Sequence, residues 1–304
     1  MSMKLNGLTA AVHTPMHDNY SVNYDCVPTQ AEHLAKGGAS GAFVTGTTGE
    51  CHSLTTKERL KMFDAWGRVA HGNGLKFIAH VGHNNLPDAQ ALVCAARDAG
   101  ADAVSAMAPN FFKPADAEAL RDWFAEVVKP APELPFYFYD IPGMTGVTVD
   151  TAEFLECAAK QIPVMAGVKY TNPDRDQLRA ILEMNGYAPD MLFGCDEELL
   201  DGLRIGCRGA VGSSYNFSAP LYLRIISAFD EGDIEAAQRD QARSAEMIRT
   251  IANYNYMPAA KSVMAMVGVD CGPARPPLRT LSRESRGNLK QDLEKIGFFD
   301  WENS

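Results

Sequence analysis

Three features that mark special classes of protein are missing from this 304-residue sequence. No apolar run approaches the roughly 20 residues that a membrane helix requires, so we expect no membrane span. The start, MSMKLNGLTAAVHTPM, has no basic head followed by a long apolar core and a small-residue cleavage site, which predicts a cytoplasmic protein without a secretory signal. The seven cysteines contain no CxxC pair, and their odd number favours free thiols over a disulfide framework.

Several functional motifs are missing as well. Lysine and arginine form no cluster and the formal net charge is −10, so we expect no nucleic-acid partner. The first strand-to-helix turn has no G-x-G-x-x-G, which argues against a dinucleotide-binding site. No G-x-S-x-G elbow supports a Ser-His-Asp hydrolase.

What the sequence does contain is a regular alternation of two kinds of segment. Eight short apolar or β-rich runs recur at nearly even intervals: residues 8–15, 41–46, 76–81, 103–109, 135–140, 164–170, 191–196 and 210–215. Segments with helical spacing lie between them. In residues 55–70, Thr55 and Glu58 form a capping box, and four apolar side chains share one predicted face: Leu60, Phe63, Trp66 and Val69.

This alternation predicts right-handed βαβ units and a parallel sheet. Eight units over about 225 residues favour a closed (β/α)8 TIM barrel in residues 1–229, with an open doubly wound sheet as the alternative fold. Residues 230–304 read as a C-terminal helical extension with helices near 233–252, 256–267 and 283–296, and CGPARPPL (271–278) as a rigid connector. The expected apolar stripe of the first of these helices comprises Ile234, Ala237, Gln241, Ala245, Ile248 and Ala252.

Polar residues gather at the predicted strand ends, where a barrel of this kind builds its active site. Lys169 ends the apolar run VMAGVK. The barrel walls would remove water from its ammonium group and favour the neutral amine, which can attack a ketone to form a Schiff base. A strand-end lysine that extends its charge to solvent is the structural alternative.

Other strand ends carry further candidates. Gly46 and Gly49 flank two threonines in GTTGE, a turn that can direct N–H groups and hydroxyls at a small anion such as a carboxylate, or that simply connects a strand to a helix. Tyr139 can relay protons, or it can be a core tyrosine whose hydroxyl binds a carbonyl. Asp196 and Glu197 can accept hydrogen bonds from substrate hydroxyls or form the acidic first turn of a helix.

The best candidates for a metal site are His80 and His83, spaced HxxH after the third predicted strand. Zinc or iron needs three or more protein ligands, and the spacing reveals no carboxylate partner at a strand end. We therefore expect no metal.

Four strand-end motifs, taken in order, resemble those of a known family. GTTGE, FYFYDIPGMTGV, GVKYT and GAVGSSYN are similar to the motifs of the dihydrodipicolinate synthase and N-acetylneuraminate lyase superfamily of Schiff-base pyruvate aldolases. The resemblance covers nearly the whole chain, including the helical extension. It implies that Lys169 condenses with the C2 ketone of pyruvate, that Tyr139 shuttles the proton of the aldol step, and that Thr47 and Thr48 hold the carboxylate.

Two features within the resemblance favour the lyase branch over the synthase branch. After YDIP the synthase branch has an arginine for its second substrate, where this chain reads Gly143, Met144, Thr145. The residues that the resemblance assigns to the sugar tail are all present: Thr171, Gly194, Asp196, Glu197 and Ser213.

One position departs from many relatives. In the loop after the fourth predicted strand they place a tyrosine from a neighbouring subunit beside the first threonine, whereas this chain has Phe111 and Phe112. The resemblance then implies a proton relay through substrate hydroxyls, Tyr139 and water. Animal-type sialic acid lyases are similar here.

The resemblance therefore implies a homotetrameric sialic acid aldolase that cleaves N-acetylneuraminate reversibly to N-acetylmannosamine and pyruvate, without metal or dissociable cofactor. Three alternatives stay open: an aldolase for a 2-keto-3-deoxy sugar acid, dihydrodipicolinate synthase, and a non-catalytic barrel that binds a keto acid.

Overall fold

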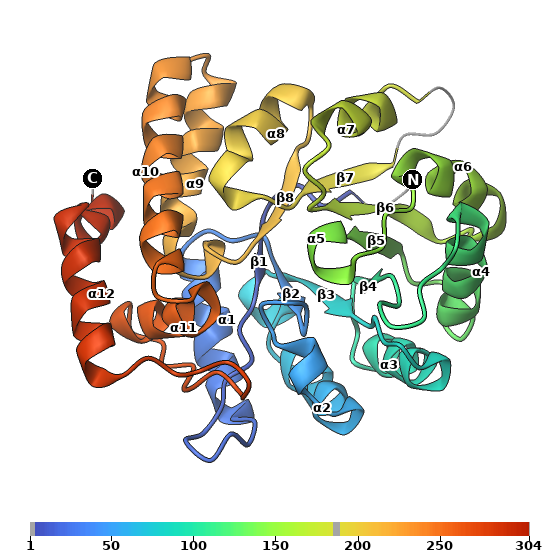
Figure 1. Ribbon diagram of the computed structural model, residues 1–304, viewed down its shortest axis with the longest axis horizontal. Coiled ribbons are helices and arrows are strands. Elements are labelled where there is room, and N and C mark those ends of the chain that lie inside the picture. Colours follow the sequence, from blue (N-terminus) through green and yellow to red (C-terminus); the bar gives the residue numbers. More distant parts are fainter. Residues whose placement is uncertain (1–3, 185–188, 304) are drawn as a thin grey trace.

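A computed structural model describes residues 4–184 and 189–303, and its centre is a closed barrel of eight parallel strands (Figure 1). Strand β1 pairs with β2 on one side and with β8 on the other, which closes the sheet and excludes the open doubly wound alternative. All eight predicted strands are present: β1 Gly7–Ala11, β2 Gly41–Val44, β3 Lys76–His80, β4 Ala103–Met107, β5 Phe136–Asp140, β6 Met165–Tyr170, β7 Asp190–Phe193 and β8 Gly209–Gly212.

Helices cover the outside of the barrel. The predicted capping box is confirmed, because Thr55 accepts a hydrogen bond from the N–H of Glu58 while the Glu58 carboxylate accepts one from the N–H of Thr55. The helices up to the end of the barrel are α1 Val27–Lys36, α2 Thr56–Gly67, α3 Leu86–Asp98, α4 Ala117–Val128, α5 Pro142–Thr145, α6 Thr151–Gln161, α7 Arg175–Leu182, α8 Leu199–Ile205 and α9 Tyr215–Asp230. Within the described residues, no helix combines the length and the apolar character needed to cross a membrane.

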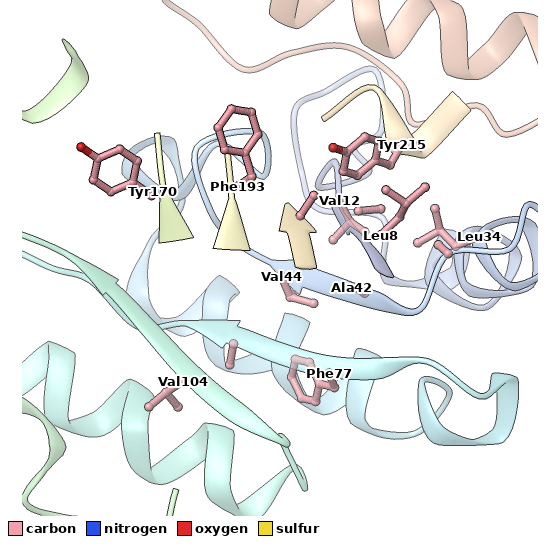
Figure 2. Close-up of a cluster of buried hydrophobic side chains, with 14 of the residues drawn as sticks. Leu8, Val12, Leu34, Ala42, Val44, Phe77, Val104, Tyr170, Phe193 and Tyr215 are labelled. Atoms are coloured by element: carbon pink, nitrogen blue, oxygen red, sulfur yellow. The ribbon is translucent and has the colours of Figure 1, made fainter. Parts of the chain in front are cut away.

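Alternation along the strands divides the core into two layers. In β5, Phe136 and Phe138 point outward and their rings contact Phe124 of α4, at centroid distances of 4.9 and 5.5 Å. Tyr137 and Tyr139 point inward and belong to the separate cluster that fills the barrel. Figure 2 shows part of the outer layer, which joins side chains of the strands to those of the surrounding helices. Each strand is therefore buried on both faces, as is typical of parallel sheets.

The buried face of α2 differs from the predicted one. Phe63 and Trp66 are buried as expected, but Leu60 and Val69 are only partly covered, and Arg59 and Met62 are buried in their place. A hydrophobic pattern cannot identify Arg59 as a core residue, because its burial depends on hydrogen bonds to backbone carbonyls of another segment.

The helical extension comprises α10 Ile234–Ala252, α11 Tyr256–Met266 and α12 Arg283–Lys295, which lie together on one side of the barrel beside α9 (Figure 1). The predicted stripe of α10 was wrong in part, since Ile234 and Ala252 are exposed. The helix instead buries a face that includes a serine whose hydroxyl is hydrogen-bonded: Ala237, Ser244, Met247 and Ile251. The division of the chain between residues 229 and 230 stays a prediction.

Helix α9 contains a kink that a histidine of α1 supports. Pro220 has no N–H, so the carbonyl of Asn216, four residues earlier, lacks its helical donor. His33 Nε2 donates to this carbonyl at 2.9 Å. His33→Leu should therefore lower the free energy of unfolding by about 1 kcal/mol, measured by urea denaturation. His33→Gln, which can still donate, should recover most of the loss, and equal stability of both variants would contradict this role.

Candidate active site

The carboxyl ends of the strands bring the candidate residues to one end of the barrel. Strands β5 and β6 are neighbours, and their register pairs Tyr139 directly with Lys169. On its other side Lys169 pairs with Leu192 of β7, just before the residues that the sequence assigns to the sugar tail. These positions follow from the closed parallel topology, because parallel strands all end on the same rim.

Lys169 lies in an apolar and aromatic environment. It is 4% exposed, and its Nζ lies 3.8 Å from the ring centroid of Tyr139 and 4.3 Å from that of Phe43. Burial lowers the pKa of Lys169 to about 7, and the negative charge of Asp196 limits the decrease. Near pH 7 a large fraction of the molecules then carry Lys169 as the neutral amine. The alternative, a lysine that extends its charge to solvent, does not fit this burial.

Tyr139 is buried beside this amine. Its hydroxyl lies 3.3 Å from Thr47 Oγ1, so within the described residues it binds another hydroxyl and not the carbonyl expected of a core tyrosine. Burial raises the pKa of Tyr139, which keeps the phenol protonated in the free protein. The pair forms a short path for a proton between the barrel interior and the Thr47 turn.

The GTTGE turn has an unexpected backbone. The left-handed residues are not its glycines but Thr45, with φ +52°, and Glu50, with φ +58°. The glycines are required by close approach, since a Cβ at Gly46 would lie 2.5 Å from the Phe43 ring and one at Gly49 would lie 2.8 Å from the Thr45 Cα. Thr47 and Thr48 thus occupy a tightly packed turn, with Thr48 only 7% exposed.

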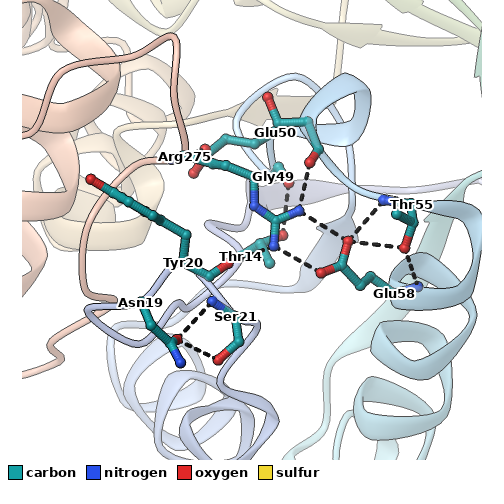
Figure 3. A network of polar contacts seen from close by, with 10 residues as sticks. Thr14, Asn19, Tyr20, Ser21, Gly49, Glu50, Thr55, Glu58 and Arg275 are labelled. Atoms are coloured by element: carbon teal, nitrogen blue, oxygen red, sulfur yellow. Dashed lines mark hydrogen bonds and ion pairs between the residues drawn. The ribbon is translucent and has the colours of Figure 1, made fainter.

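The helical extension holds Glu50 at the end of this turn. Its Oε1 forms an ion pair with Lys261 of α11 at 2.7 Å, with both side chains 1% exposed, and its Oε2 accepts a hydrogen bond from the N–H of Arg275 at 2.7 Å. The Arg275 guanidinium in turn binds both carboxylate oxygens of Glu58 (Figure 3). The sequence predicted only that residues 271–278 form a rigid connector. The feature that could have indicated this contact is Arg275, a charged residue between Pro273 and Pro276.

The strand-end residues of β7 and β8 form the opposite side of the rim. Asp196 Oδ2 accepts hydrogen bonds from the N–H and the hydroxyl of Ser214, at 2.8 and 2.6 Å. Ser213 Oγ lies 2.8 Å from the hydroxyl of Tyr256, the first residue of α11. Tyr256 was not among the predicted site residues, because nothing in the sequence shows that α11 returns to the barrel mouth. Glu197 is exposed beside Asp196.

Thr171 directly follows β6 and Gly194 directly follows β7, so the two residues meet at the ends of neighbouring strands. Thr171 Oγ1 donates to the Gly194 carbonyl at 3.4 Å. A Cβ at position 194 would collide with the same Thr171 oxygen, so this contact requires glycine. Every residue predicted for the sugar tail therefore lies at one rim of the barrel.

The HxxH alternative does not fit the structure. His80 is completely buried, its Nδ1 lies 3.0 Å from the Thr45 carbonyl, and its Nε2 accepts from the N–H of Met107 at 3.3 Å. Both ring nitrogens are thus engaged by backbone. His83 Nδ1 accepts a separate bond from the N–H of Asn85, at 2.9 Å.

Comparison with known proteins gives the family. Residues 4–296 match the model described as the dihydrodipicolinate synthetase family. The chain belongs to this family. Curated relatives include the N-acetylneuraminate lyase of Rattus norvegicus, 34% identical over 98% of this chain and 94% of that protein, and that of Danio rerio, 37% identical over 90% and 91%.

Solved structures agree with this membership of the dihydrodipicolinate synthetase family. The Proteus mirabilis N-acetylneuraminate lyase superposes with a TM-score of 0.94 at 35% identity, over 97% of this chain and 100% of that one. The sialic acid aldolase of Aliivibrio salmonicida gives 0.94 at 33% identity, over 97% and 98%. The (β/α)8 barrel with its C-terminal helices is therefore the fold shared with these proteins.

The loop after β4 exposes two aromatic side chains. Phe111 and Phe112 are 78% and 86% exposed and contact each other edge to face. Near this loop a cavity of about 270 Å³ opens at the rim, with Thr47, Met107, Asn110 and Met144 in its lining.

Proposed function

We propose that the protein is a class I aldolase that cleaves N-acetylneuraminate reversibly to N-acetylmannosamine and pyruvate. The observation that carries this proposal is the buried amine of Lys169, with its pKa near 7, next to the Tyr139 hydroxyl and the Thr47 turn. The relatives and structural neighbours described above are N-acetylneuraminate lyases, which supports the same substrate.

The geometry supports the following order of steps. The neutral amine of Lys169 attacks the C2 ketone, and loss of water gives an iminium, with the carboxylate held by Thr47 and Thr48. Tyr139 relays the proton from the C4 hydroxyl while the C3–C4 bond breaks and its electrons move into the iminium. The resulting enamine is protonated at C3 and hydrolysed to pyruvate. The protonated imine is the electron sink, so these steps use no metal or dissociable cofactor.

The sugar tail would lie against the β7 and β8 side of the rim. There the proposed contacts are Thr171, Gly194, Asp196, Glu197 and Ser213, of which Ser213 is oriented by Tyr256. One Asp196 oxygen holds Ser214, which leaves the other carboxylate oxygen for a substrate hydroxyl. The synthase branch has an arginine after YDIP, where this chain has Gly143, Met144 and Thr145, and this disfavours dihydrodipicolinate synthesis.

Steady-state kinetics decides the substrate. The value of kcat/KM for N-acetylneuraminate should exceed that for 2-keto-3-deoxygluconate, and an equal or lower value would assign the protein to the other class of pyruvate-dependent aldolase. Borohydride trapping with pyruvate separates both aldolases from a non-catalytic keto-acid-binding barrel, since only an aldolase forms a covalent adduct.

The lowered pKa of Lys169 predicts a specific pH profile. The free enzyme needs the neutral amine, so kcat/KM for N-acetylneuraminate should rise with pH, bend near the lysine pKa of about 7, and fall about tenfold per unit below pH 6. A bend near pH 10 would mean that the amine titrates like an ordinary surface lysine.

We also propose that the protein is a cytoplasmic homotetramer. All seven cysteines are free thiols, in keeping with a reducing compartment. The exposed Phe111 and Phe112 would be covered by a neighbouring subunit at the rim. Phe112→Asp should then yield species smaller than the tetramer by light scattering, because burying a carboxylate in that contact is unfavourable. Phe112→Tyr should stay tetrameric. An unchanged mass for Phe112→Asp would mean that the subunit contact does not involve Phe112.

A further inference from the structure

Arg59 of α2 is a buried cation that binds backbone. It is 1% exposed, and its guanidinium donates to the carbonyls of His80 at 2.6 Å and Gly82 at 2.9 Å. Among the described residues it forms no ion pair with a carboxylate. Burial lowers the pKa of Arg59 only to about 10, so it stays charged at neutral pH. An arginine buried in this way fixes the segment that carries the two carbonyls.

That segment includes His80. Only one tautomer of its ring is consistent with the hydrogen bonds that the two ring nitrogens form. Nε2 accepts the N–H of Met107, so the proton must lie on Nδ1, which donates to the Thr45 carbonyl. Burial, together with the positive charges of Arg59 and Lys169, holds the pKa of His80 well below its usual value. The ring is therefore a neutral and fixed donor and acceptor between β4 and the end of β2.

His80 holds Thr45 through two bonds. Its ring binds the Thr45 carbonyl at 3.0 Å, and its own carbonyl accepts the Thr45 hydroxyl at 3.2 Å. Thr45 has the left-handed φ of +52°, which a β-branched residue adopts only when its surroundings impose it. Gly46 and the two threonines of the turn follow directly, so the conformation of Thr45 sets where their N–H groups and hydroxyls point.

The same ring also contacts the other half of the site. Its centroid lies 6.0 Å from that of Tyr139, edge to face, and 5.9 Å from that of Phe43. Gly82 makes room for it, since a Cβ there would lie 2.8 Å from His80 Nε2.

We propose that His80, braced by Arg59, is a positioning residue that holds Thr45 and thereby keeps the Thr47–Thr48 turn in the conformation that binds the substrate carboxylate. This inference rests on the proposed function and concerns the carboxylate end of its substrate. Loss of the His80 imidazole should weaken the binding of pyruvate more than it slows the chemistry at Lys169.

The test measures, for the wild type and each variant, the pyruvate concentration at which borohydride trapping reaches half of its maximum. The reduced adduct is detected by the intact mass of the protein. His80→Phe keeps an aromatic ring and removes both hydrogen bonds of the imidazole, to the Thr45 carbonyl and from the Met107 N–H, and it should raise this concentration at least about tenfold while the final yield of adduct is unchanged. His80→Asn, whose amide can still donate to the Thr45 carbonyl, should stay within about threefold of the wild type. Ser105→Ala is the matched control, because Ser105 is a buried β4 residue with no bond to the turn.

The outcomes separate this inference from the proposed function. If the wild type forms no adduct, the proposed function fails and this inference fails with it. If the wild type forms the adduct and His80→Phe leaves the half-saturating concentration within about twofold, or Ser105→Ala raises it equally, only the positioning role is wrong. If His80→Phe does not fold, His80→Leu decides: it also deletes the ring bond to the Thr45 carbonyl, and an unchanged half-saturating concentration overturns the proposal.

Discussion

Replacing Lys169 with Ala is expected to abolish turnover of N-acetylneuraminate, with a loss on the order of 10⁵-fold in kcat. The lysine would form the covalent link to substrate, and no other amine is placed against the Tyr139 ring and the Thr47 turn within the described residues. The variant should also give no borohydride adduct with pyruvate. Lys76→Ala, which changes a lysine at the start of β3 on the opposite rim, should keep both activities.

The inactivity of a Lys169 variant should not come from unfolding. A base whose pKa is about 7 in the folded protein, against 10.5 unperturbed, costs on the order of 4 kcal/mol of stability at pH 7. Because a base with a lowered folded pKa destabilises most below that pKa, the cost shrinks as pH rises toward 10. Lys169→Met, similar in length and uncharged, should therefore be inactive and melt above the wild type at pH 7. A lower melting temperature, or residual adduct, would contradict the assignment.

Tyr139→Phe should reduce kcat by about 10² to 10⁴-fold while the half-saturating pyruvate concentration in trapping changes little. The variant loses only the hydroxyl that faces Thr47, and the ring over Lys169 remains. Rapid-quench single turnovers would locate the loss in the carbon–carbon step.

The matched control is Tyr137→Phe. Tyr137 lies two residues earlier on the same inward face, and its hydroxyl donates to Asp190 at 2.9 Å, deeper in the barrel. This variant should be less stable and keep its kcat. Full activity of Tyr139→Phe would remove the proton relay from the proposed mechanism.

Much of the fold could be predicted because it depends on local patterns. Apolar runs of strand length identified all eight strands. The period of two along a strand puts Tyr137 and Tyr139 on one face, and the structure shows that this face is the inner one. Once the strands close in sequence order, the ends of β2, β5 and β6 meet, which is why Lys169, Tyr139 and Thr47 could be grouped from the sequence.

The missed features depend on contacts between distant segments. Glu50 binds residues of the extension more than 200 positions away, and Ser213 meets Tyr256 across two helices. Arg59 and Ser244 are polar side chains that become core residues only because particular partners satisfy them. The positive φ of Thr45 could not be predicted either, because a β-branched residue rarely adopts it and two glycines lie in the same turn.

The ion pair between Glu50 and Lys261 has a consequence for anyone who redesigns this barrel. Residues 46–50 are not a loop that can be transplanted by itself, because breaking a buried pair by removing one partner is strongly destabilising. A graft of this turn onto another scaffold must therefore include Lys261 and the connector that carries Arg275. The smallest part of this protein that can be exchanged thus combines the turn after β2 with segments of the last quarter of the chain.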